Sequence, residues 1–311
     1  MINPKLKAID RIYKELPQDL QELMRQHVLS DEEHKLVLED IKKKSYFEKT
    51  PVDKPKFIIV LGQTGSGKSN LTTSLIRQEP NLVVIDSDKY KAYRTDSSKI
   101  QREHFVEYAF LTAPDAYQHR DEMICDTMNS KYNILVECAT SEKDGMFVDL
   151  EQIKEAGYDI EIEVLAVSHL NSLLSIHERY EAEIQLGSSA AKLTNINRHD
   201  DSFTSLRKCV MDVQNKDVKV SVYKRGEEVL LYTPKKMYSS TDEIQSFSSA
   251  VEALDYIQLQ DKKNVLKDFY QRYTIIQQQM FKRNAPNQQI EQLEEIRRRG
   301  IDEQQLLYRG I

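Results

Sequence analysis

The chain has 311 residues, which is enough for one large α/β domain or for two smaller ones. Charged residues make up 30% of it and the net charge is −6, which argues against nucleic acid as the main partner. No apolar run approaches membrane-spanning length, the N-terminus lacks the apolar core of a signal peptide, and the three cysteines show no metal-ligand spacing. The sequence therefore predicts a cytoplasmic protein with reduced thiols and no membrane partner.

Residues 1–50 are predicted to form a helical N-terminal extension. Ser30-Asp31-Glu32-Glu33 matches a capping box, the pattern in which the first and fourth side chains each bond the other residue's backbone. Apolar residues follow it at helical spacing, namely Leu36, Val37 and Ile41. The extension therefore contains at least one helix that begins near Ser30.

The most informative motif comes next, where residues 62–69 read GQTGSGKS and fit the pattern G-x-x-x-x-G-K-[ST]. The apolar run Phe57–Leu61 before it predicts a buried strand, and Asn70–Gln78 after it predicts a helix. In this context the loop backbone and the helix N-terminus bind phosphate. We expect Lys68 to reach the β- and γ-phosphates of a nucleoside triphosphate and Ser69 to ligate Mg²⁺. The whole loop is the predicted nucleotide site: Gly62, Gln63, Thr64, Gly65, Ser66, Gly67, Lys68 and Ser69.

Residues 51–240 alternate predicted strands and helices. Besides Phe57–Leu61, the predicted strands are Leu82–Ile85, Asn133–Glu137, Ile160–Val167, Lys219–Tyr223 and Val229–Tyr232. The predicted helices include Asp121–Met128, Leu150–Glu155 and Leu170–Leu186, and Lys224–Glu227 is predicted to be a hairpin turn. This alternation predicts an α/β fold with a mostly parallel sheet and helices on both faces. Residues 241–311 are predicted to be a helical C-terminal extension, in which Arg297-Arg298-Arg299 is interpreted as a solvated helix face.

Carboxylates follow two of the predicted strands. Asp86 and Asp88 come directly after Leu82–Ile85, and Glu137 ends its strand. Because ligands on parallel sheets bind beyond the carboxyl ends of the strands, we expect these side chains to converge on the phosphate loop. One of the two aspartates can hold Mg²⁺ through water while the other accepts a proton from a hydroxyl. Helix capping is the alternative role for this pair.

Cations are also expected near a transferring phosphoryl group, because negative charge spreads over its oxygens. Arg179 lies on the predicted helix Leu170–Leu186, and Lys192 lies in the polar segment Gly187–Asp200, which is predicted to be a mobile lid. The seven histidines show no metal constellation, and His199-Asp200 is interpreted as a structural pair.

Taken together, these blocks resemble the zeta toxin family, the kinase components of bacterial toxin–antitoxin modules. The resemblance covers about residues 55–235 and rests on the phosphate loop and on six further blocks, Val84–Asp88, Tyr132–Glu137, Ala166-Val167, Asn171-Ser172, Glu178–Glu181 and His199-Asp200. It implies a P-loop kinase-like fold that uses ATP and Mg²⁺. It also implies phosphorylation of the 3′-hydroxyl of UDP-N-acetylglucosamine or a related UDP-sugar, which blocks cell-wall synthesis, and a protein antitoxin as partner.

The same resemblance implies roles for single residues. Asp88 matches the general base, and Lys68 and Arg179 match the catalytic cations. Lys192 stands where the family has a second phosphate-binding arginine. Asp88, Glu122, Glu137 and Thr140 match the substrate pocket, while Ser69 and Asp86 are the metal candidates. The family's pocket sequence Gly-Thr-Gly-Arg reads Cys138-Ala139-Thr140-Ser141 here, which changes the surroundings of the acceptor.

Two alternatives remain open. The altered pocket is compatible with another acceptor, such as a nucleotide, a nucleoside cofactor like NAD, or a nucleic-acid end, although the acidic net charge disfavours the last. The other alternative is a nucleotide-dependent switch. Switch GTPases carry N-K-x-D for guanine, and Asn215-Lys216-Asp217-Val218 misses this pattern because its aspartate falls one place early.

Overall fold

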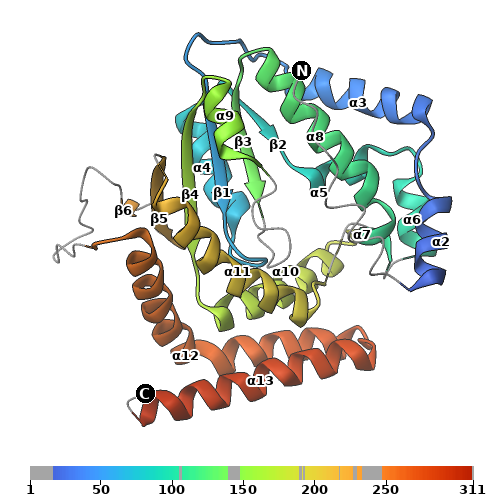
Figure 1. Ribbon diagram of the computed structural model, residues 1–311. Coiled ribbons are helices and arrows are strands. Elements are labelled where there is room, and N and C mark those ends of the chain that lie inside the picture. Colours follow the sequence, from blue (N-terminus) through green and yellow to red (C-terminus); the bar gives the residue numbers. More distant parts are fainter. Residues whose placement is uncertain are drawn as a thin grey trace. The chain divides into compact units, whose positions relative to one another are not determined.

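The computed structural model describes residues 17–104, 107–138, 148–188, 191, 193–216, 218–226, 230–232 and 247–309 (Figure 1). These residues form two compact units. Unit 1 holds the described residues within Met1–Ile59, Leu75–Glu137 and Phe147–Ile160. Unit 2 holds those within Val60–Ser74, Cys138–Met146 and Glu161–Ile311. Each unit is described by itself below.

The strand order of the sheet is β2-β3-β1-β4-β5-β6. The strands are β1 (Lys56–Leu61), β2 (Leu82–Ile85), β3 (Asn133–Cys138), β4 (Asp159–Ala166), β5 (Lys219–Lys224) and β6 (Leu230–Tyr232). Each predicted strand end agrees with the observed one within a residue, because the strands are short runs of buried apolar side chains with polar flanks. Val229 and Glu227 lie outside the described residues. The predicted α/β class is confirmed.

In unit 1, β2 runs parallel to β3, with Leu82 opposite Asn133 and Ile85 opposite Val136. Its helices are α2 (Gln18–Gln26), α3 (Asp31–Ser45), α5 (Ser87–Tyr90), η1 (Lys91–Tyr93), α6 (Ser97–Glu103), α7 (Tyr108–Leu111), α8 (Ala113–Asn129) and α9 (Leu150–Glu155). The short helices from α5 to α7 were not predicted, because so few turns show no apolar periodicity. Helix α8 begins earlier than the predicted Asp121.

Helix α3 of the N-terminal extension packs on α8. The predicted capping box is present, with the Ser30 and Glu33 side chains each bonding the other residue's backbone N–H. Ile41 is fully buried, whereas Leu36 is 72% exposed, so the buried face of α3 is narrower than predicted. At the end of the helix, Lys42 and the Tyr46 hydroxyl both donate to the Asp126 carboxylate, at 3.2 and 2.7 Å.

In unit 2, β4 runs parallel to β5, and β5 pairs antiparallel with β6. The antiparallel pairing agrees with the predicted hairpin. Of its predicted turn, Lys224 is the last residue of β5 and Gly226 adopts a φ of 78°. The helices are α4 (Lys68–Gln78, whose last turn belongs to unit 1), α10 (His169–Gln185), α11 (Ile196–Gln214), α12 (Ala250–Lys282) and α13 (Asn287–Tyr308). Because Asn195 caps α11, the last five residues of the predicted lid segment are helical.

The long helices α12 and α13 lie side by side (Figure 1). Their contact is close because Gly300 has no side chain, and a Cβ there would overlap the Phe269 ring. Phe269, Ile276 and Ile296 pack with Leu170 and Leu174 of α10 in one apolar cluster. The hairpin therefore covers an apolar face of α10.

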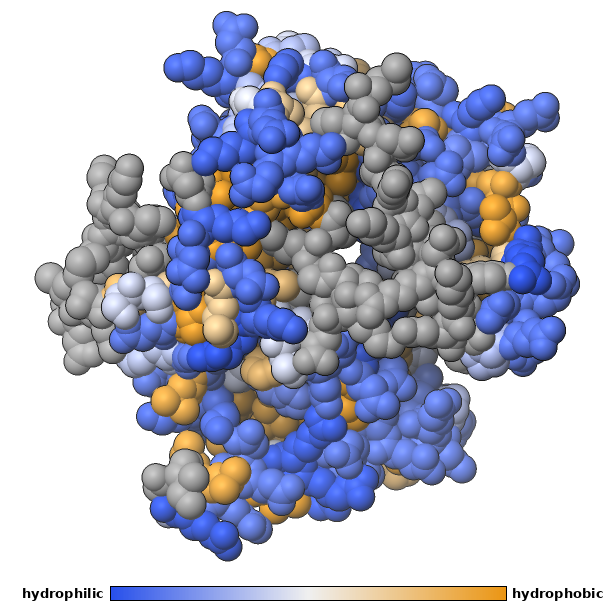
Figure 2. Space-filling view, in the orientation of Figure 1, coloured by the Kyte–Doolittle hydropathy of each residue, from blue (hydrophilic) through white to orange (hydrophobic). Residues whose placement is uncertain are grey.

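Charged residues make up 30% of the chain, so a polar surface is expected. The face drawn in Figure 2 is mostly hydrophilic. None of the helices in the described ranges has an apolar stretch that is long enough to cross a bilayer.

Candidate functional site: the phosphate loop and its surroundings

The loop between β1 and α4 depends on its glycines. Gly65 and Gly67 have φ angles of 80° and 98°, in the left-handed region that side chains disfavour. A Cβ on Gly65 would overlap the carbonyl oxygen of Ser172 and lie 2.7 Å from Ile176 Cγ1. The loop backbone therefore lies directly against α10, and only glycine fits at position 65.

Gln63 bonds the loop to neighbouring residues, and Lys68 bonds the loop backbone itself. Gln63 is fully buried, and its Nε2 donates to the Val167 carbonyl at 2.7 Å and to Ser172 Oγ at 3.2 Å. Lys68 Nζ donates to the carbonyls of Gly62 and Gln63, at 2.8 and 3.2 Å. The lysine ammonium is thus held over the loop by the loop's own carbonyls. Ser69 is exposed in the first turn of α4.

In unit 1, Asp86 is the N-cap of α5. Its Oδ1 accepts from the Asp88 amide at 3.0 Å, and its Oδ2 lies 3.6 Å from Lys89 Nζ. Asp86 therefore has the alternative role, helix capping. A carboxylate that accepts one hydrogen bond retains lone pairs for a further ligand, so capping does not compete with the metal role.

The Asp88 side chain is 71% exposed. Its Oδ1 accepts from the ammonium of Lys91 at 2.5 Å, and Lys91 is itself buried. The short helix α5 thus presents the Asp88 carboxylate to solvent, and the buried Lys91 of η1 holds that carboxylate in place.

The predicted pocket residue Glu122 lies on α8 and faces the N-terminal extension. It accepts from His34 Nε2 of α3 at 3.1 Å and from Gln118 at 2.9 Å. Partial burial opposes ionisation, but these hydrogen bonds outweigh it and lower the pKa of Glu122. His34 in turn stacks on His119, with ring centroids 3.9 Å apart. This partnership was not predicted, because His34 and Glu122 are far apart along the chain.

The remaining predicted residues lie on β3 and α10 or outside the described ranges. Glu137 is half-buried near the end of β3. Arg179 is exposed on α10, with its Nε 3.7 Å from Glu183. Thr140 and Lys192 lie outside the described residues.

Beneath the loop, His199 joins Ser172 to Asp200. The His199 Nε2 lies 2.8 Å from Ser172 Oγ, and its Nδ1 lies 3.2 Å from Asp200 Oδ1. Burial, reinforced by the neighbouring His169, lowers the pKa of His199 to about 4, so the ring is neutral at pH 7. The neutral ring donates from Nδ1 to the carboxylate, which has no proton to give, so Nε2 is left as an acceptor. It faces Ser172 Oγ, whose one proton is also within hydrogen-bond reach of the Ser168 and His169 carbonyls.

Asp200 gathers two further residues, His169 and Arg299, which the sequence did not link to it. His169 Nε2 lies 2.7 Å from Asp200 Oδ1, and Arg299 of α13 donates to both carboxylate oxygens, at 3.0 and 2.8 Å. His169, His199 and Asp200 lie close enough together to ligate a metal ion. However, the Arg299 guanidinium already pairs with both oxygens of this carboxylate, and its positive charge would repel a divalent cation. The cluster therefore does not fit a metal ion. Arg299 is thus no solvated residue, in contrast to the exposed Arg298.

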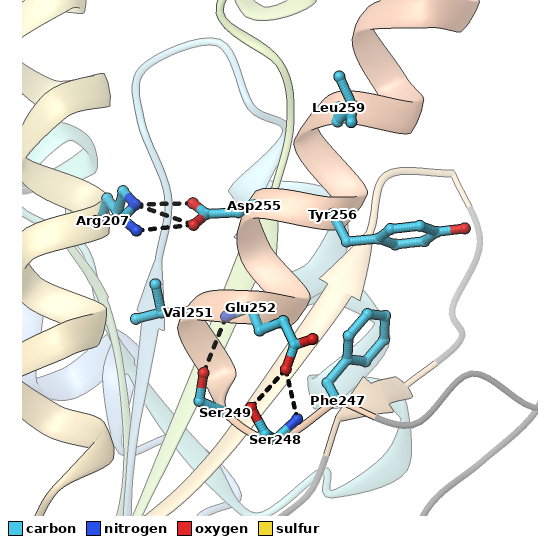
Figure 3. Close-up of a pocket in the computed structure, with 9 residues that line it drawn as sticks. All are labelled: Arg207, Phe247, Ser248, Ser249, Val251, Glu252, Asp255, Tyr256 and Leu259. Carbon is cyan, nitrogen blue, oxygen red and sulfur yellow. Dashed lines mark hydrogen bonds and ion pairs between the residues drawn. The ribbon is translucent and has the colours of Figure 1, made fainter.

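A separate pocket of about 570 Å³ lies beside the start of α12 (Figure 3). Its polar groups bond one another. Arg207 of α11 forms a forked pair with Asp255, and Ser248 donates to Glu252. None of the residues that line this pocket was predicted to bind a ligand.

A glycine phosphate loop between a strand and a helix of a largely parallel sheet defines a P-loop kinase-like α/β protein. Residues 39–237 match the model of the zeta toxin family, and the chain belongs to that family. It is 24% identical over 159 residues to toxin zeta of Enterococcus hirae, over 51% of this chain and 56% of that protein. It is 22% identical to toxin PezT of Streptococcus pneumoniae serotype 4, over 61% of this chain and 77% of that protein.

A solved structure supports the same fold. A chain from the PezAT chromosomal toxin–antitoxin system of Streptococcus pneumoniae matches with a TM-score of 0.64 at 19% identity, over 81% of this chain and 98% of the other. At this identity the likeness shows the fold. The match with the toxin zeta proteins of Enterococcus hirae, Streptococcus pyogenes and Streptococcus agalactiae spans little more than half of their length.

Proposed function

We propose that this chain is a kinase that transfers the γ-phosphate of ATP, with Mg²⁺, to the 3′-hydroxyl of UDP-N-acetylglucosamine or a related UDP-sugar, and so blocks cell-wall synthesis. The observation that carries the proposal is the phosphate loop. Positive φ angles at Gly65 and Gly67 curl its backbone, and the Lys68 ammonium lies over it. A curled backbone with a lysine at its mouth is the arrangement that binds nucleotide phosphates.

Each residue has a proposed role. Residues 62–69 and Lys192 bind ATP, and Lys68 and Arg179 stabilise the transferring phosphoryl group. Ser69 and Asp86 hold Mg²⁺, which when bound neutralises charge on the β- and γ-oxygens. Asp88 accepts the proton of the acceptor hydroxyl, and its exposure to solvent suits a group that must meet a substrate. Glu122, Glu137 and Thr140 line the acceptor site.

The wider assignments are also proposals. We propose a kinase core at residues 51–240 between helical extensions at 1–50 and 241–311. We further propose a cytoplasmic location and a protein antitoxin that inhibits the kinase. The family membership supports the antitoxin, since one of the solved relatives comes from a toxin–antitoxin system.

The test is a transfer assay with a panel of acceptors. The purified chain is incubated with ATP, Mg²⁺ and separate samples of UDP-sugars, nucleotides and NAD, and mass spectrometry detects any acceptor that gains one phosphate. Lys68→Ala serves as the control, because removal of the ammonium removes a charge from the phosphate site. Phosphorylated UDP-N-acetylglucosamine, made by the wild type and not by Lys68→Ala, is the expected result.

Other outcomes discriminate between the alternatives. A phosphorylated nucleotide or NAD would support the proposed kinase activity with a different acceptor. The changed residues after Glu137 are compatible with that outcome. ATP binding without transfer to any acceptor would instead favour a nucleotide-dependent switch.

A further inference from the structure

Arg225 lies beside the phosphate loop, although the sequence indicated only a turn there. It follows β5 directly, at the carboxyl end of a strand that is parallel to β4. Its Nε is 3.6 Å from the point where a Cβ on Gly67 would lie. The side of the loop that Gly67 leaves bare therefore faces a guanidinium.

The charge of Arg225 is poorly balanced by its surroundings. Its Nη1 donates to Ser175 Oγ at 2.6 Å, and among the described residues no carboxylate lies within ion-pair distance. Burial and the neighbouring cation Arg272 lower its pKa by more than the negative charges of Asp261 and Glu178 raise it. A half-buried cation without a carboxylate is costly, unless an anion completes the site when it binds.

Arg272 shows the contrast. This residue of α12 donates from Nε and Nη2 to the two oxygens of Glu178, both at 2.7 Å, and from Nη1 to Asn171 Oδ1 at 2.8 Å. Its Nη2 also lies 3.3 Å from Ser175 Oγ, so the two guanidinium groups share one hydroxyl. Arg272 is satisfied by protein groups and positions Ser175, whereas Arg225 retains donors for a ligand.

We propose that Arg225 is a nucleotide-binding residue whose guanidinium contacts the phosphate chain of ATP. The proposal rests on the nucleotide site proposed above and adds to it a residue from β5. The loop amides near Gly67 are those that cradle the α- and β-phosphates in such loops. A planar guanidinium fork matches the spacing of phosphate oxygens and forms strong charge-assisted hydrogen bonds with them. Gly67 keeps the space between the fork and the loop clear of a side chain.

The test compares ligands that share phosphates but differ in the nucleoside. Dissociation constants for ATP, ADP and inorganic tripolyphosphate are measured by titration calorimetry for the wild type, Arg225→Gln and Arg225→Lys. Arg207→Gln is the matched control, because it removes an exposed arginine of unit 2 that pairs with Asp255. We expect Arg225→Gln to raise the dissociation constants of all three ligands by about tenfold to a hundredfold. Arg225→Lys should recover part of the loss, because it keeps the charge but not the fork.

A second variant guards against misfolding. Ser175→Ala removes the hydroxyl that holds the guanidinium while it keeps the cation, and we expect a smaller loss of affinity in the same three ligands. Urea unfolding of each variant separates lost binding from lost structure.

Three results would overturn the proposal. Wild-type affinities in a folded Arg225→Gln protein would make the arginine a structural brace only. Weaker ATP and ADP binding with unchanged tripolyphosphate binding would move the contact from the phosphates to the nucleoside. If the wild type binds none of the three ligands, the proposed function itself fails together with this inference.

Discussion

At the scale of single residues, Gly65 is the point where the phosphate loop meets α10. Gly65→Ala places a methyl group against the Ser172 carbonyl and 2.7 Å from Ile176 Cγ1. We expect the free energy of unfolding to fall by roughly 1–3 kcal/mol beyond the backbone penalty, and the loop to move and lose nucleotide affinity. Urea unfolding and ATP titration measure the two effects.

The matched control for Gly65 is Gly187→Ala. Gly187 also has a positive φ, 67°, but no atom lies within 4 Å of its added Cβ. This variant should show only the left-handed backbone penalty, about 1–2 kcal/mol, and should bind ATP like the wild type. Equal losses in both variants would mean that the contact with α10 does not constrain the loop.

Asp88 carries the residue-scale prediction for catalysis. Asp88→Asn keeps the shape of the side chain but can no longer accept a proton. We expect kcat to fall by about a factor of 10² to 10⁴ while the dissociation constant for ATP stays unchanged. Steady-state kinetics with the acceptor that the transfer assay identifies, together with ATP titration, check both parts. Full activity in Asp88→Asn would remove the residue from the role of base.

At the scale of elements, arginines of the C-terminal hairpin hold α10 in place. Arg283, the C-cap residue of α12, donates from Nε and Nη2 to the two oxygens of Glu181, at 2.7 and 2.6 Å, and that side chain is only 1% exposed. Arg283→Ala would leave a buried charge without its counter-ion, so we expect a loss of about 3 kcal/mol in the free energy of unfolding.

The control for Arg283 lies on α13. Arg297 pairs with Glu294 one turn away, and both side chains are substantially exposed. Arg297→Ala should leave the urea midpoint unchanged, because exposed pairs of this kind contribute little. If the two variants lose equal stability, the burial of Glu181 is not what makes its ion pair important.

At the scale of the whole molecule, buried histidines link stability to pH. Burial, together with the charge of Arg283, lowers the pKa of His177 from 6.5 to about 4, and Gln292 of α13 is its hydrogen-bond partner. Between pH 6.5 and 4 the unfolded chain therefore binds a proton that the folded chain excludes. Above pH 6.5 this histidine does not lower the free energy of unfolding. As the pH falls from 6.5 to 4, the free energy of unfolding decreases by up to about 1.4 kcal/mol per pH unit.

The variant His177→Gln isolates this effect. It removes the titrating ring. As the pH is lowered from 7 to 5, the free energy of unfolding of the wild type should therefore fall by more than that of the variant. Urea unfolding at several pH values gives this difference directly. Parallel pH profiles for the two proteins would contradict the assignment.

Much of the fold was predictable because its determinants are local. Leu82–Ile85 was recognisable as a strand from its own apolar residues, and the phosphate loop from the spacing of Gly62, Gly67 and Lys68. In contrast, the partnerships of Glu122 with His34 and of Asp200 with Arg299 join distant segments. They depend on how helices pack, which no local pattern encodes.

The candidate site divides in the same way. Lys68 was predictable because its role follows from its place in the loop motif. Arg225 was not, because a single arginine in a hairpin turn is indistinguishable from a solvated one until the fold brings it to Gly67. The role of Asp88 is a prediction that the Asp88→Asn variant tests, and the roles of Asp86, Glu137 and Arg179 also remain predictions.

The α12–α13 hairpin also determines where the chain can be joined to a relative, by recombination or by design. The family match ends at residue 237, before either helix begins. Yet Leu170 and Leu174 of α10 pack against the hairpin, and Glu178, Glu181 and Asp200 receive arginines from it. A graft made at the family boundary would therefore carry an uncovered apolar face and unmatched acidic groups. For recombination between relatives, the viable breakpoint lies outside the hairpin, which has to travel with the α10 that it fits.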